Sequence, residues 1–311
     1  MGGYSYFEGN IVPDDQAKIS IKTHAFNYGT GCFEGIRGYW NEDEEQLYLF
    51  RLPEHYERLK RSCRILGMGL PRSPQELCDL TLELVRQNGP RQDVYVRPIA
   101  YKSSEIVGVR MHDIKDELAI FTVPFGKYLP AEDGCRCATS SYRRVDDNAI
   151  PARAKVTGIY VNSALAKSEA ILNGFDEAIM LTHDGHVSEG SGENIFLVMD
   201  GKLVTPAASE NILVGITRNS VIEIARTEFG IETVERQIDR SELWIADECF
   251  MTGTAAEISP IVEVDRRQIG DGRVGPISNN LRALFNDIVR GRVESYRKWC
   301  TPTYSKVGSG V

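Results

Sequence analysis

The chain has 311 residues, 36 of them basic and 44 acidic, so its formal net charge is -8. A chain of this length can bury a sizeable core, and it predicts two domains because single cores stop growing at about 250 to 300 residues. The acidic balance and the lack of any basic run argue against nucleic acid as a partner and favour a small molecule.

The remaining composition indicates a cytoplasmic protein. No stretch approaches the roughly 20 consecutive apolar residues of a membrane span, and the N-terminus lacks the basic and apolar regions of a signal peptide. The seven cysteines are scattered without a CxxC pair, which suits reduced thiols. Because Cys135 and Cys137 stand alone and the five histidines are dispersed, we expect no metal. The lack of a long apolar stretch predicts no membrane contact.

The first part of the chain predicts a hairpin, two helices and a strand. Tyr4–Phe7 and residues 11–12 flank a Glu-Gly-Asn turn. Residues 54–66 carry apolar side chains at helical spacing after a proline. A second helix opens at Ser73-Pro-Gln-Glu76, which can form a capping box, and closes at Asn88-Gly89. Residues 93–101 alternate as a strand does.

An interdomain connection is predicted at residues 126–134. The segment has no sustained periodicity and ends in proline and glycine, as linkers often do. We therefore expect a small N-terminal domain at 1–125 and a larger C-terminal domain at 135–311.

The second part predicts hairpins rather than alternating strands and helices. A strand near residues 137–142 precedes a helix at 158–173, and the Asp184-Gly185 and Asp200-Gly201 turns then separate short apolar runs. Such turns indicate antiparallel hairpins, so the expected class is α+β, with a mixed sheet or pseudobarrel in the larger domain. Later elements are predicted as helices at 216–229 and 277–289 and a strand at 249–252.

The segment from Gly270 to Gly275 matches the dinucleotide fingerprint GxGxxG. The fingerprint requires a buried strand before it and an acidic strand end about 20 residues later. Here a polar stretch precedes it and Pro276 follows at once. We interpret it as a surface turn.

Lys155 is the candidate catalytic residue. It stands among small and apolar residues in Ile150-Pro-Ala-Arg-Ala-Lys155. A poorly hydrated lysine can be neutral near pH 7 and can add to a carbonyl to form a Schiff base. An ordinary surface ion pair is the more common role for a single lysine, so the interpretation depends on its companions.

A pyridoxal phosphate enzyme needs a Schiff-base lysine, an acid for the pyridine nitrogen and a phosphate cradle, and four further parts of the chain match these needs. Glu189 lies in a glycine-rich break. The segment 213–218 leads into a helix, whose N-terminal N–H groups can bind phosphate. The turn 252–257 supplies hydroxyl and N–H donors, and Arg58 lies on the flank of an apolar helix face.

Together these segments resemble the branched-chain amino acid aminotransferases, which are class IV, fold type IV pyridoxal phosphate enzymes. The matching segments occur in the family's order over nearly the whole chain: Phe33-Glu-Gly-Ile-Arg-Gly-Tyr39, His55-x-x-Arg58, Tyr95-Val-Arg-Pro98, Ala154-Lys155, Ser188-Glu-Gly-Ser-Gly-Glu-Asn194, Gly215-Ile-Thr-Arg218 and Gly253-Thr-Ala-Ala-Glu257.

The resemblance implies a role for each cofactor-binding residue. Lys155 would form the Schiff base with pyridoxal 5'-phosphate and shuttle the proton, Glu189 would bind the pyridine nitrogen, and Tyr160 the ring oxygen. The phosphate would be held by Arg58, Ile216, Thr217 and Thr254. The resemblance also assigns to the cofactor site Gly192, Asn194, Leu213 and Gly215.

The substrate site follows in the same way. Backbone N–H groups of Thr254 and Ala255, with Tyr95, would hold the α-carboxylate. Arg97 would take the distal carboxylate of glutamate, together with Tyr28 of the neighbouring subunit. The apolar side-chain pocket would be formed by Phe33, Phe125, Tyr128 and Tyr160, and Val109 also belongs to the predicted substrate site.

The implied reaction transfers the amino group of leucine, isoleucine or valine to 2-oxoglutarate in a ping-pong cycle. The implied partners are amino acids, 2-oxo acids and further copies of the chain, in a homodimer or larger homo-oligomer whose active site is completed by a neighbour's loop.

Several alternatives remain open at this stage. A D-amino acid transaminase, an (R)-amine transaminase and an aminodeoxychorismate lyase share the fold. A Schiff-base enzyme without cofactor should form a parallel barrel, which the hairpins contradict, and a silent oligomeric binding protein would have an unreactive lysine.

Overall fold

The computed structural model describes residues 3–126, 128–129 and 133–305. The chain divides into two compact units, the first formed by residues 1–126, 154–158 and 286–311, the second by residues 127–153 and 159–285. The short segment 154–158 and the last part of the chain thus group with the first unit, although continuous domains were expected. The predicted connection at 126–134 lies partly outside the described residues, and the predicted domain bounds stay a prediction.

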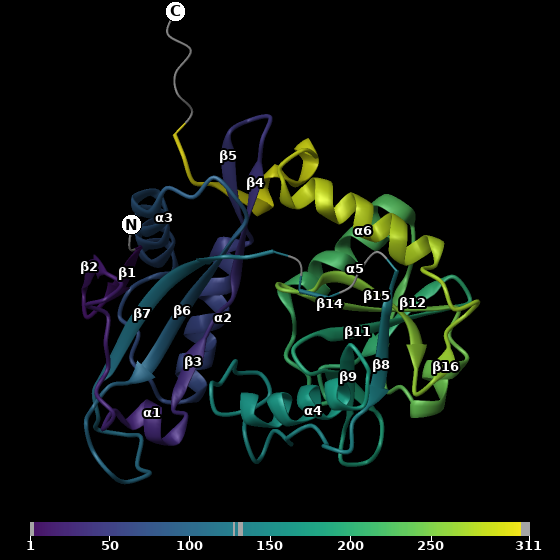
Figure 1. Cartoon of the computed structure of the whole chain (residues 1–311), viewed down its shortest axis with the longest axis horizontal. Coiled ribbons are helices and arrows are strands. Elements are labelled where there is room, and N and C mark those ends of the chain that lie inside the picture. The colour runs from purple at the N-terminus through teal and green to yellow at the C-terminus, as the bar shows by residue number, and fades with distance from the viewer. Residues whose placement is uncertain (1–2, 127, 130–132, 306–311) are drawn as a thin grey trace, which may run out of the picture. The chain divides into compact units, whose positions relative to one another are not determined.

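The first unit contains an eight-stranded sheet with the order β17-β5-β4-β6-β7-β1-β2 and with β3 paired to β6. Figure 1 shows its long central strands β6 and β7 beside α2 and α3. The strands are β1 (Tyr4–Phe7), β2 (Asn10–Pro13), β3 (Gly31–Phe33), β4 (Ile36–Asn41), β5 (Gln46–Phe50), β6 (Val94–Lys102), β7 (Asp116–Pro124) and β17 (Cys300–Pro302). The helices are α1 (His24–Tyr28), α2 (Leu52–Ile65), α3 (Pro74–Asn88) and the 3-10 helix η2 (Glu294–Trp299).

Local sequence accounts for the helices of this unit. Ser73 accepts the Glu76 N–H while the Glu76 side chain accepts the Ser73 N–H, so the predicted capping box begins α3. Gly89 ends it in the left-handed conformation, with φ 58°. In α2 the predicted apolar face buries Tyr56, Leu59 and Cys63. The predicted first hairpin is confirmed by the antiparallel pairing of β1 with β2.

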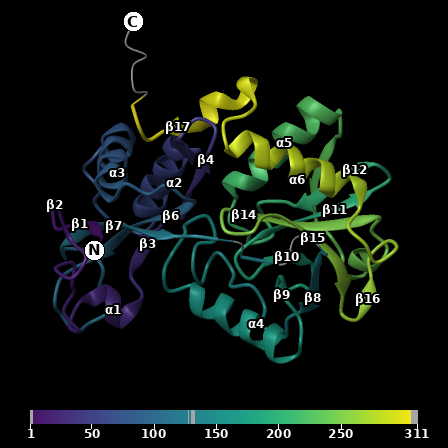
Figure 2. The same ribbon diagram turned by 45° about the horizontal axis from the view of Figure 1, so that its top comes forward.

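The second unit contains a nine-stranded sheet with the order β10-β9-β8-β15-β14-β11-β12-β13 and with β16 paired to β15. The strands are β8 (Cys135–Thr139), β9 (Glu177–Leu181), β10 (Val187–Gly190), β11 (Asn194–Met199), β12 (Lys202–Pro206), β13 (Thr233–Arg236), β14 (Glu248–Gly253), β15 (Glu257–Val264) and β16 (Arg267–Gln268). Its helices are α4 (Tyr160–Leu172), α5 (Ile216–Phe229) and the 3-10 helix η1 (Arg240–Trp244). Helix α6 (Pro276–Val289) contains the boundary between the units. Helix α4 packs against β8 and β9 and α5 against β13 and β14 (Figure 2).

The predicted α+β class is confirmed. Both predicted Asp-Gly turns join antiparallel strands, β9 to β10 and β11 to β12, and parallel pairs join β8 to β9 and to β15 and β12 to β13. Gly270 and Gly272 have positive φ in the turn that follows β16, so the GxGxxG match is a turn as predicted.

One predicted strand was misplaced. The strand expected near residues 137–142 spans Cys135–Thr139. Beyond Thr139 the hydroxyl of Ser140 and the N–H of Ser141 donate to the Glu169 carboxylate on α4, at 2.6 and 2.9 Å. The Ser140 N–H still donates to the Ile179 carbonyl of β9 at 2.9 Å, and the ladder ends at Ser141, whose N–H binds the side chain instead.

Candidate active site

Lys155 is held by its backbone in the first unit. Its carbonyl accepts the Phe33 N–H at 3.0 Å, and its own N–H donates to the Ser62 hydroxyl of α2 at 3.2 Å. The next residue, Val156, bridges Cys32. The Lys155 amine lies 5.0 Å from the centre of the Phe33 ring. The side chain therefore starts from a fixed backbone and points toward an aromatic wall.

Arg58 is anchored by a carboxylate of the same unit. Glu34 is fully buried, and it accepts the Nε of Arg58 at 2.7 Å and the Nη2 at 2.8 Å. His55 lies one helical turn before Arg58 on α2 and bonds Glu34 at 2.7 Å. Burial alone would raise the pKa of Glu34, but the charge and hydrogen bonds of Arg58, with His55, hold it well below its usual range.

Tyr95 and Arg97 project from the same side of β6, as their spacing predicted. The Arg97 Nη2 donates to the Tyr95 hydroxyl at 3.2 Å, and the guanidinium carbon lies 4.4 Å from the centre of the Phe33 ring. The Phe125 and Tyr95 rings are 4.9 Å apart. A side chain at Gly35 would start 1.7 Å from the Tyr95 hydroxyl, so glycine is required there. One cation, one phenol and two phenyl rings are thus brought together.

Tyr28 and the loop of residues 104–110 form one surface of the first unit. The Tyr28 hydroxyl accepts the Gly108 N–H at 2.9 Å, and His24 bonds the Gly108 carbonyl through Nε2 at 2.8 Å. Val109 is 80 % exposed and Tyr28 37 % exposed. Both predicted residues therefore face solvent in the single chain.

Glu189 is surrounded by donors within the second unit. It lies on β10 and is buried, and the Arg144 guanidinium contacts its Oε1 at 2.8 Å. Its Oε2 accepts the Leu213 N–H at 3.1 Å and the Asn194 amide at 3.2 Å. A cation and two N–H donors thus fix the position of this carboxylate.

The N-terminus of α5 is shaped by glycine. Gly215 is its N-cap, and no side chain caps the first turn, which begins with Ile216 and Thr217. A Cβ at Gly215 would lie 2.1 Å from the Asn194 Oδ1. The uncapped N–H groups and the positive end of the helix make an anion site.

The remaining predicted residues of the second unit lie in turns and at a helix end. Thr254 and Ala255 form the turn between β14 and β15. Gly192 is exposed in the turn before β11 and donates its N–H to Glu193. Tyr160 is the first residue of α4. Tyr128 is 46 % exposed, with its ring centre 5.5 Å from the Lys167 amine.

Residues 31–264 match the protein family described as Amino-transferase class IV. The chain belongs to the class IV aminotransferases.

Relatives and solved structures agree with this assignment. This class IV aminotransferase is 52 % identical, over 97 % of either chain, to a probable branched-chain-amino-acid aminotransferase of Aquifex aeolicus. It is similar, with a TM-score of 0.94 and 46 % identity over 98 % of this chain and all of the other, to the branched-chain aminotransferase of Thermoproteus uzoniensis solved with norvaline. The PLP form of the Thermobaculum terrenum enzyme matches with a TM-score of 0.93 and 38 % identity, over 98 % of this chain and 99 % of that one.

Sequence reasoning missed two partners in this class IV aminotransferase. Arg144, which binds Glu189, has no motif or spacing that marks it. Glu34, which binds Arg58, stands inside the Phe33-Glu-Gly-Ile-Arg segment, where a charge between apolar residues was the available signal. Arg58 was expected to need an anion, and the chain itself supplies one.

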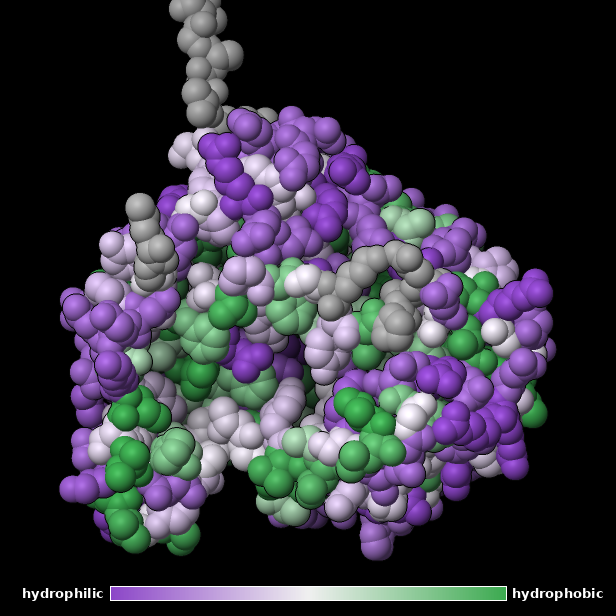
Figure 3. Space-filling model, in the orientation of Figure 1, coloured by the Kyte–Doolittle hydropathy of each residue, from purple (hydrophilic) through white to green (hydrophobic). Residues whose placement is uncertain are grey.

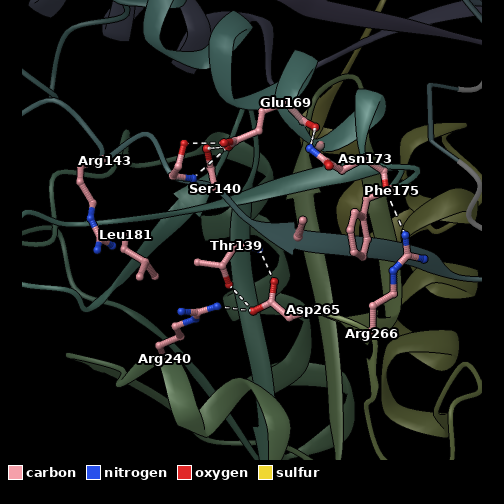
Figure 4. A pocket seen from close by; sticks show the side chains of 13 residues that line it. Thr139, Ser140, Arg143, Glu169, Asn173, Phe175, Leu181, Arg240, Asp265 and Arg266 are labelled. Atoms are coloured by element: carbon pink, nitrogen blue, oxygen red, sulfur yellow. Dashed lines mark hydrogen bonds and ion pairs between the residues drawn. The ribbon is translucent and has the colours of Figure 1, made fainter.

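A groove of about 580 Å³ on the second unit lies apart from the predicted residues. Figure 4 shows its two carboxylates, Asp265 and Glu169, bound by neighbouring polar side chains. Asp265 binds Thr139 and Arg240, and Glu169 binds Ser140. Because both of its carboxylates are already bound within the groove, we assign no function to it.

Within the described residues, no group of His, Cys, Asp and Glu could hold a metal ion, and no helix is long and apolar enough to cross a membrane. The seven cysteines are free and buried.

Proposed function

We infer that the protein is a branched-chain amino acid aminotransferase that uses pyridoxal 5'-phosphate. It transfers the amino group of leucine, isoleucine or valine to 2-oxoglutarate. The observation that carries this conclusion is the 52 % identity, over nearly the whole chain, to an enzyme of that name. The alternatives of the same fold are not favoured, because the similar structures are also named branched-chain aminotransferases.

The residues present fit the cofactor. The Thr252 hydroxyl is buried and has no hydrogen-bond partner among the described residues, and it precedes the Thr254 turn. The α5 N-terminus is uncapped beside a position where only glycine fits. When bound, pyridoxal phosphate supplies an electron sink that stabilises negative charge at the substrate α-carbon.

Lys155 is assigned two tasks. Its amine would hold the cofactor covalently, and as the free amine it would accept the proton that leaves the substrate α-carbon and give it back later in the cycle. The two backbone hydrogen bonds at Lys155 support this assignment, because a proton carrier must return to the same position in each cycle.

Glu189 is assigned to the pyridine nitrogen. A carboxylate that stays charged can accept the N–H of a pyridinium and keep that proton in place. The Arg144 guanidinium, 2.8 Å from the Glu189 Oε1, holds the carboxylate in place. Asn194, which donates both to Glu189 and to the Leu213 carbonyl, orients the carboxylate.

The phosphate is assigned to donors of two kinds. Arg58 supplies a fixed positive charge, whereas Ile216 and Thr217 supply N–H groups at a helix N-terminus. Thr254 contributes from the β14–β15 turn. Gly192, Leu213 and Gly215 are assigned to the cofactor site as a whole. Tyr160 is assigned to the ring oxygen.

The substrate residues suit two unlike side chains. Arg97 can bind the distal carboxylate of glutamate: its Nη2 donates to the Tyr95 hydroxyl, whereas its buried Nε has no hydrogen-bond partner among the described residues. Phe33 and Phe125, with Tyr128, offer apolar surface to a branched side chain. The backbone of Thr254 and Ala255 is assigned to the α-carboxylate. Aromatic rings beside a cation can thus accept either an aliphatic or an acidic group.

We propose that the protein works as a homo-oligomer, at least a dimer, in the cytoplasm. Exposed apolar side chains gather at the end of the first unit where α1 lies (Figure 3), and Phe26 is 67 %, Val107 92 % and Val109 80 % exposed. A patch of this kind usually marks an interface. Tyr28 and Val109 would then reach the substrate site of a neighbouring copy. Seven free thiols suit a reducing compartment.

Reductive trapping tests the chemistry. Borohydride should fix the cofactor to the peptide that contains Lys155, and amino-group transfer in Lys155→Ala should fall by about 10²- to 10⁴-fold or more. Lys202→Ala, which alters an exposed lysine paired with Glu232, should keep full activity. Half-reaction rates should be fastest with L-leucine, compared with D-alanine and (R)-1-phenylethylamine. An adduct on another peptide would refute the role of Lys155, and fastest turnover of D-alanine would refute the substrate class.

A further inference from the structure

The buried ion pair between Glu34 and Arg58 neutralises both charges and also fixes the orientation of the Arg58 guanidinium. Glu34 follows β3 directly and is fully buried, and Arg58 on α2 is 7 % exposed. The guanidinium meets the carboxylate with two parallel hydrogen bonds, Nε to Oε1 at 2.7 Å and Nη2 to Oε2 at 2.8 Å. A two-point contact of this kind fixes both the position and the plane of the guanidinium.

His55 stabilises the same carboxylate from α2. Its Nδ1 lies 2.7 Å from the Glu34 Oε2. A charged carboxylate can only accept, so the proton is on Nδ1. Burial lowers the pKa of His55, against the effect of Glu34, and the ring remains a neutral donor. The Glu34 carboxylate thus accepts hydrogen bonds from His55 and Arg58, which lie one helical turn apart on α2.

The backbone next to Glu34 is tied to Lys155. The Phe33 N–H donates to the Lys155 carbonyl at 3.0 Å, and the Lys155 N–H donates to Ser62 on α2 at 3.2 Å. Glu34 therefore links two parts of the first unit, the strand end that holds Lys155 and the helix that carries Arg58.

We propose that Glu34 is a positioning residue that aims Arg58 at the cofactor phosphate and fixes its separation from Lys155. This inference rests on the proposed role of Arg58 in the phosphate site. Glu34 accepts from both Nε and Nη2, so this two-point contact fixes the plane in which the guanidinium can meet a phosphate.

A comparison of two ligands separates this role from a purely structural one. Apoprotein should be titrated with pyridoxal 5'-phosphate and with pyridoxal, which lacks the phosphate, and the dissociation constants measured by absorbance. In Glu34→Gln the constant for the phosphorylated ligand should rise about 10- to 100-fold, the effect of losing a charge-assisted contact. The constant for pyridoxal should change less than about threefold, because its Schiff base does not use Arg58.

A matched control comes from the second unit. Glu177 is also fully buried and pairs with Lys167 at 2.5 Å. Glu177→Gln should change the two constants by the same factor, whatever its effect on stability. Arg58→Gln should reproduce the phosphate-specific loss. Adding Glu34→Gln to Arg58→Gln should cause no further phosphate-specific loss, because Glu34 acts on the phosphate only through Arg58.

Three results would overturn the proposal: equal losses for both ligands in Glu34→Gln, additive losses in the double variant, or tighter binding of the phosphorylated ligand. The last would mean that Glu34 merely offsets the charge of Arg58. If Glu34→Gln does not fold, Glu34→Asp retains the charge but withdraws the carboxylate by one methylene group, and it should show a smaller loss with the same selectivity. Wild-type protein that takes up neither ligand would instead refute the function as a whole.

Discussion

At the scale of single residues, Glu193 stands out as a carboxyl buried close to other carboxyls. It is 4 % exposed, and its Oε2 accepts the Gly192 N–H at 3.0 Å. Burial, followed by the charge of Glu177, raises the pKa of Glu193 to about 8, although the Gly192 hydrogen bond and Lys167 act in the opposite direction. Glu193 is thus largely protonated in the folded protein at neutral pH.

This protonation predicts a pH-dependent stability. The ordinary pKa is 4.5, so the stabilisation from a neutral Glu193 is complete below that pH and is lost as the pH rises through 8. In Glu193→Gln the side chain is always neutral, and the decline of the unfolding free energy between pH 5 and 9 should be reduced by on the order of a few kcal/mol. Urea titrations at a series of pH values measure this.

The control for Glu193 is a carboxyl in solvent. Glu83 is exposed on α3, and Glu83→Gln should leave the slope of stability against pH as in the wild type. Parallel pH curves for the wild type and Glu193→Gln would show that Glu193 is charged in the folded state.

Sequence could mark candidate residues but not their partners. Lys155 and Glu189 lie in segments with special composition, a small apolar stretch and a glycine-rich turn, so their chemistry is visible locally. Arg144 reaches Glu189 from a distant, unremarkable segment. Such a contact depends on how β8 and β10 enter the same sheet, and no local pattern encodes that. The roles of these residues stay predictions until the variants are measured.

At the scale of elements, the helices that could be predicted have sequence signals at their own ends. The bounds of α5 match those expected, residues 216–229, and the capping box of α3 was visible as Ser73-Pro-Gln-Glu76. By contrast β4 and β5 were missed. Every residue of either strand is buried, so the alternation that marks a half-exposed strand is absent.

The start of α5 offers a test of element placement. Gly215 has φ -73°, which alanine can adopt, so Gly215→Ala acts only through its added methyl group, 2.1 Å from the Asn194 Oδ1. Asn194 must move, and with it the donor to Glu189. We expect a loss of about 1–3 kcal/mol in unfolding free energy, typical of overpacking, and weaker cofactor binding in an absorbance titration.

Gly126→Ala is the matched control for this change, because a Cβ there meets nothing within 4 Å. It should leave unfolding and cofactor binding as in the wild type. If Gly215→Ala bound the cofactor as tightly as Gly126→Ala, the α5 N-terminus would have no part in the site.

At the scale of the whole molecule, the chain crosses between its two units more often than continuous domains allow. Residues 154–158 belong to the first unit although the residues on either side belong to the second. The Thr157 N–H donates to the Gly31 carbonyl and the Gly158 N–H to that of Gly29. A side chain on Gly29 would start 2.8 Å from the Gly158 Cα. Such a close backbone approach between distant segments leaves no periodic trace in the sequence, so the division into units could not be derived from it.

The assembly of copies gives the last prediction. Val107 is 92 % exposed at the tip of the loop that bonds Tyr28 through Gly108. A large exposed aliphatic residue in a loop held by hydrogen bonds is costly in water unless another surface covers it. An aspartate there would have to be desolvated at the interface, which costs far more than the lost apolar contact. Val107→Asp should therefore shift the protein toward monomers in sedimentation velocity. It should also lower amino-group transfer, because Tyr28 and Val109 would no longer reach a neighbouring site.

Ile245→Asp changes an aliphatic residue that is 71 % exposed on the second unit, and it should alter neither property. A monomeric Val107→Asp with full activity would show that the site needs no neighbour, and an unchanged oligomer would place the interface elsewhere.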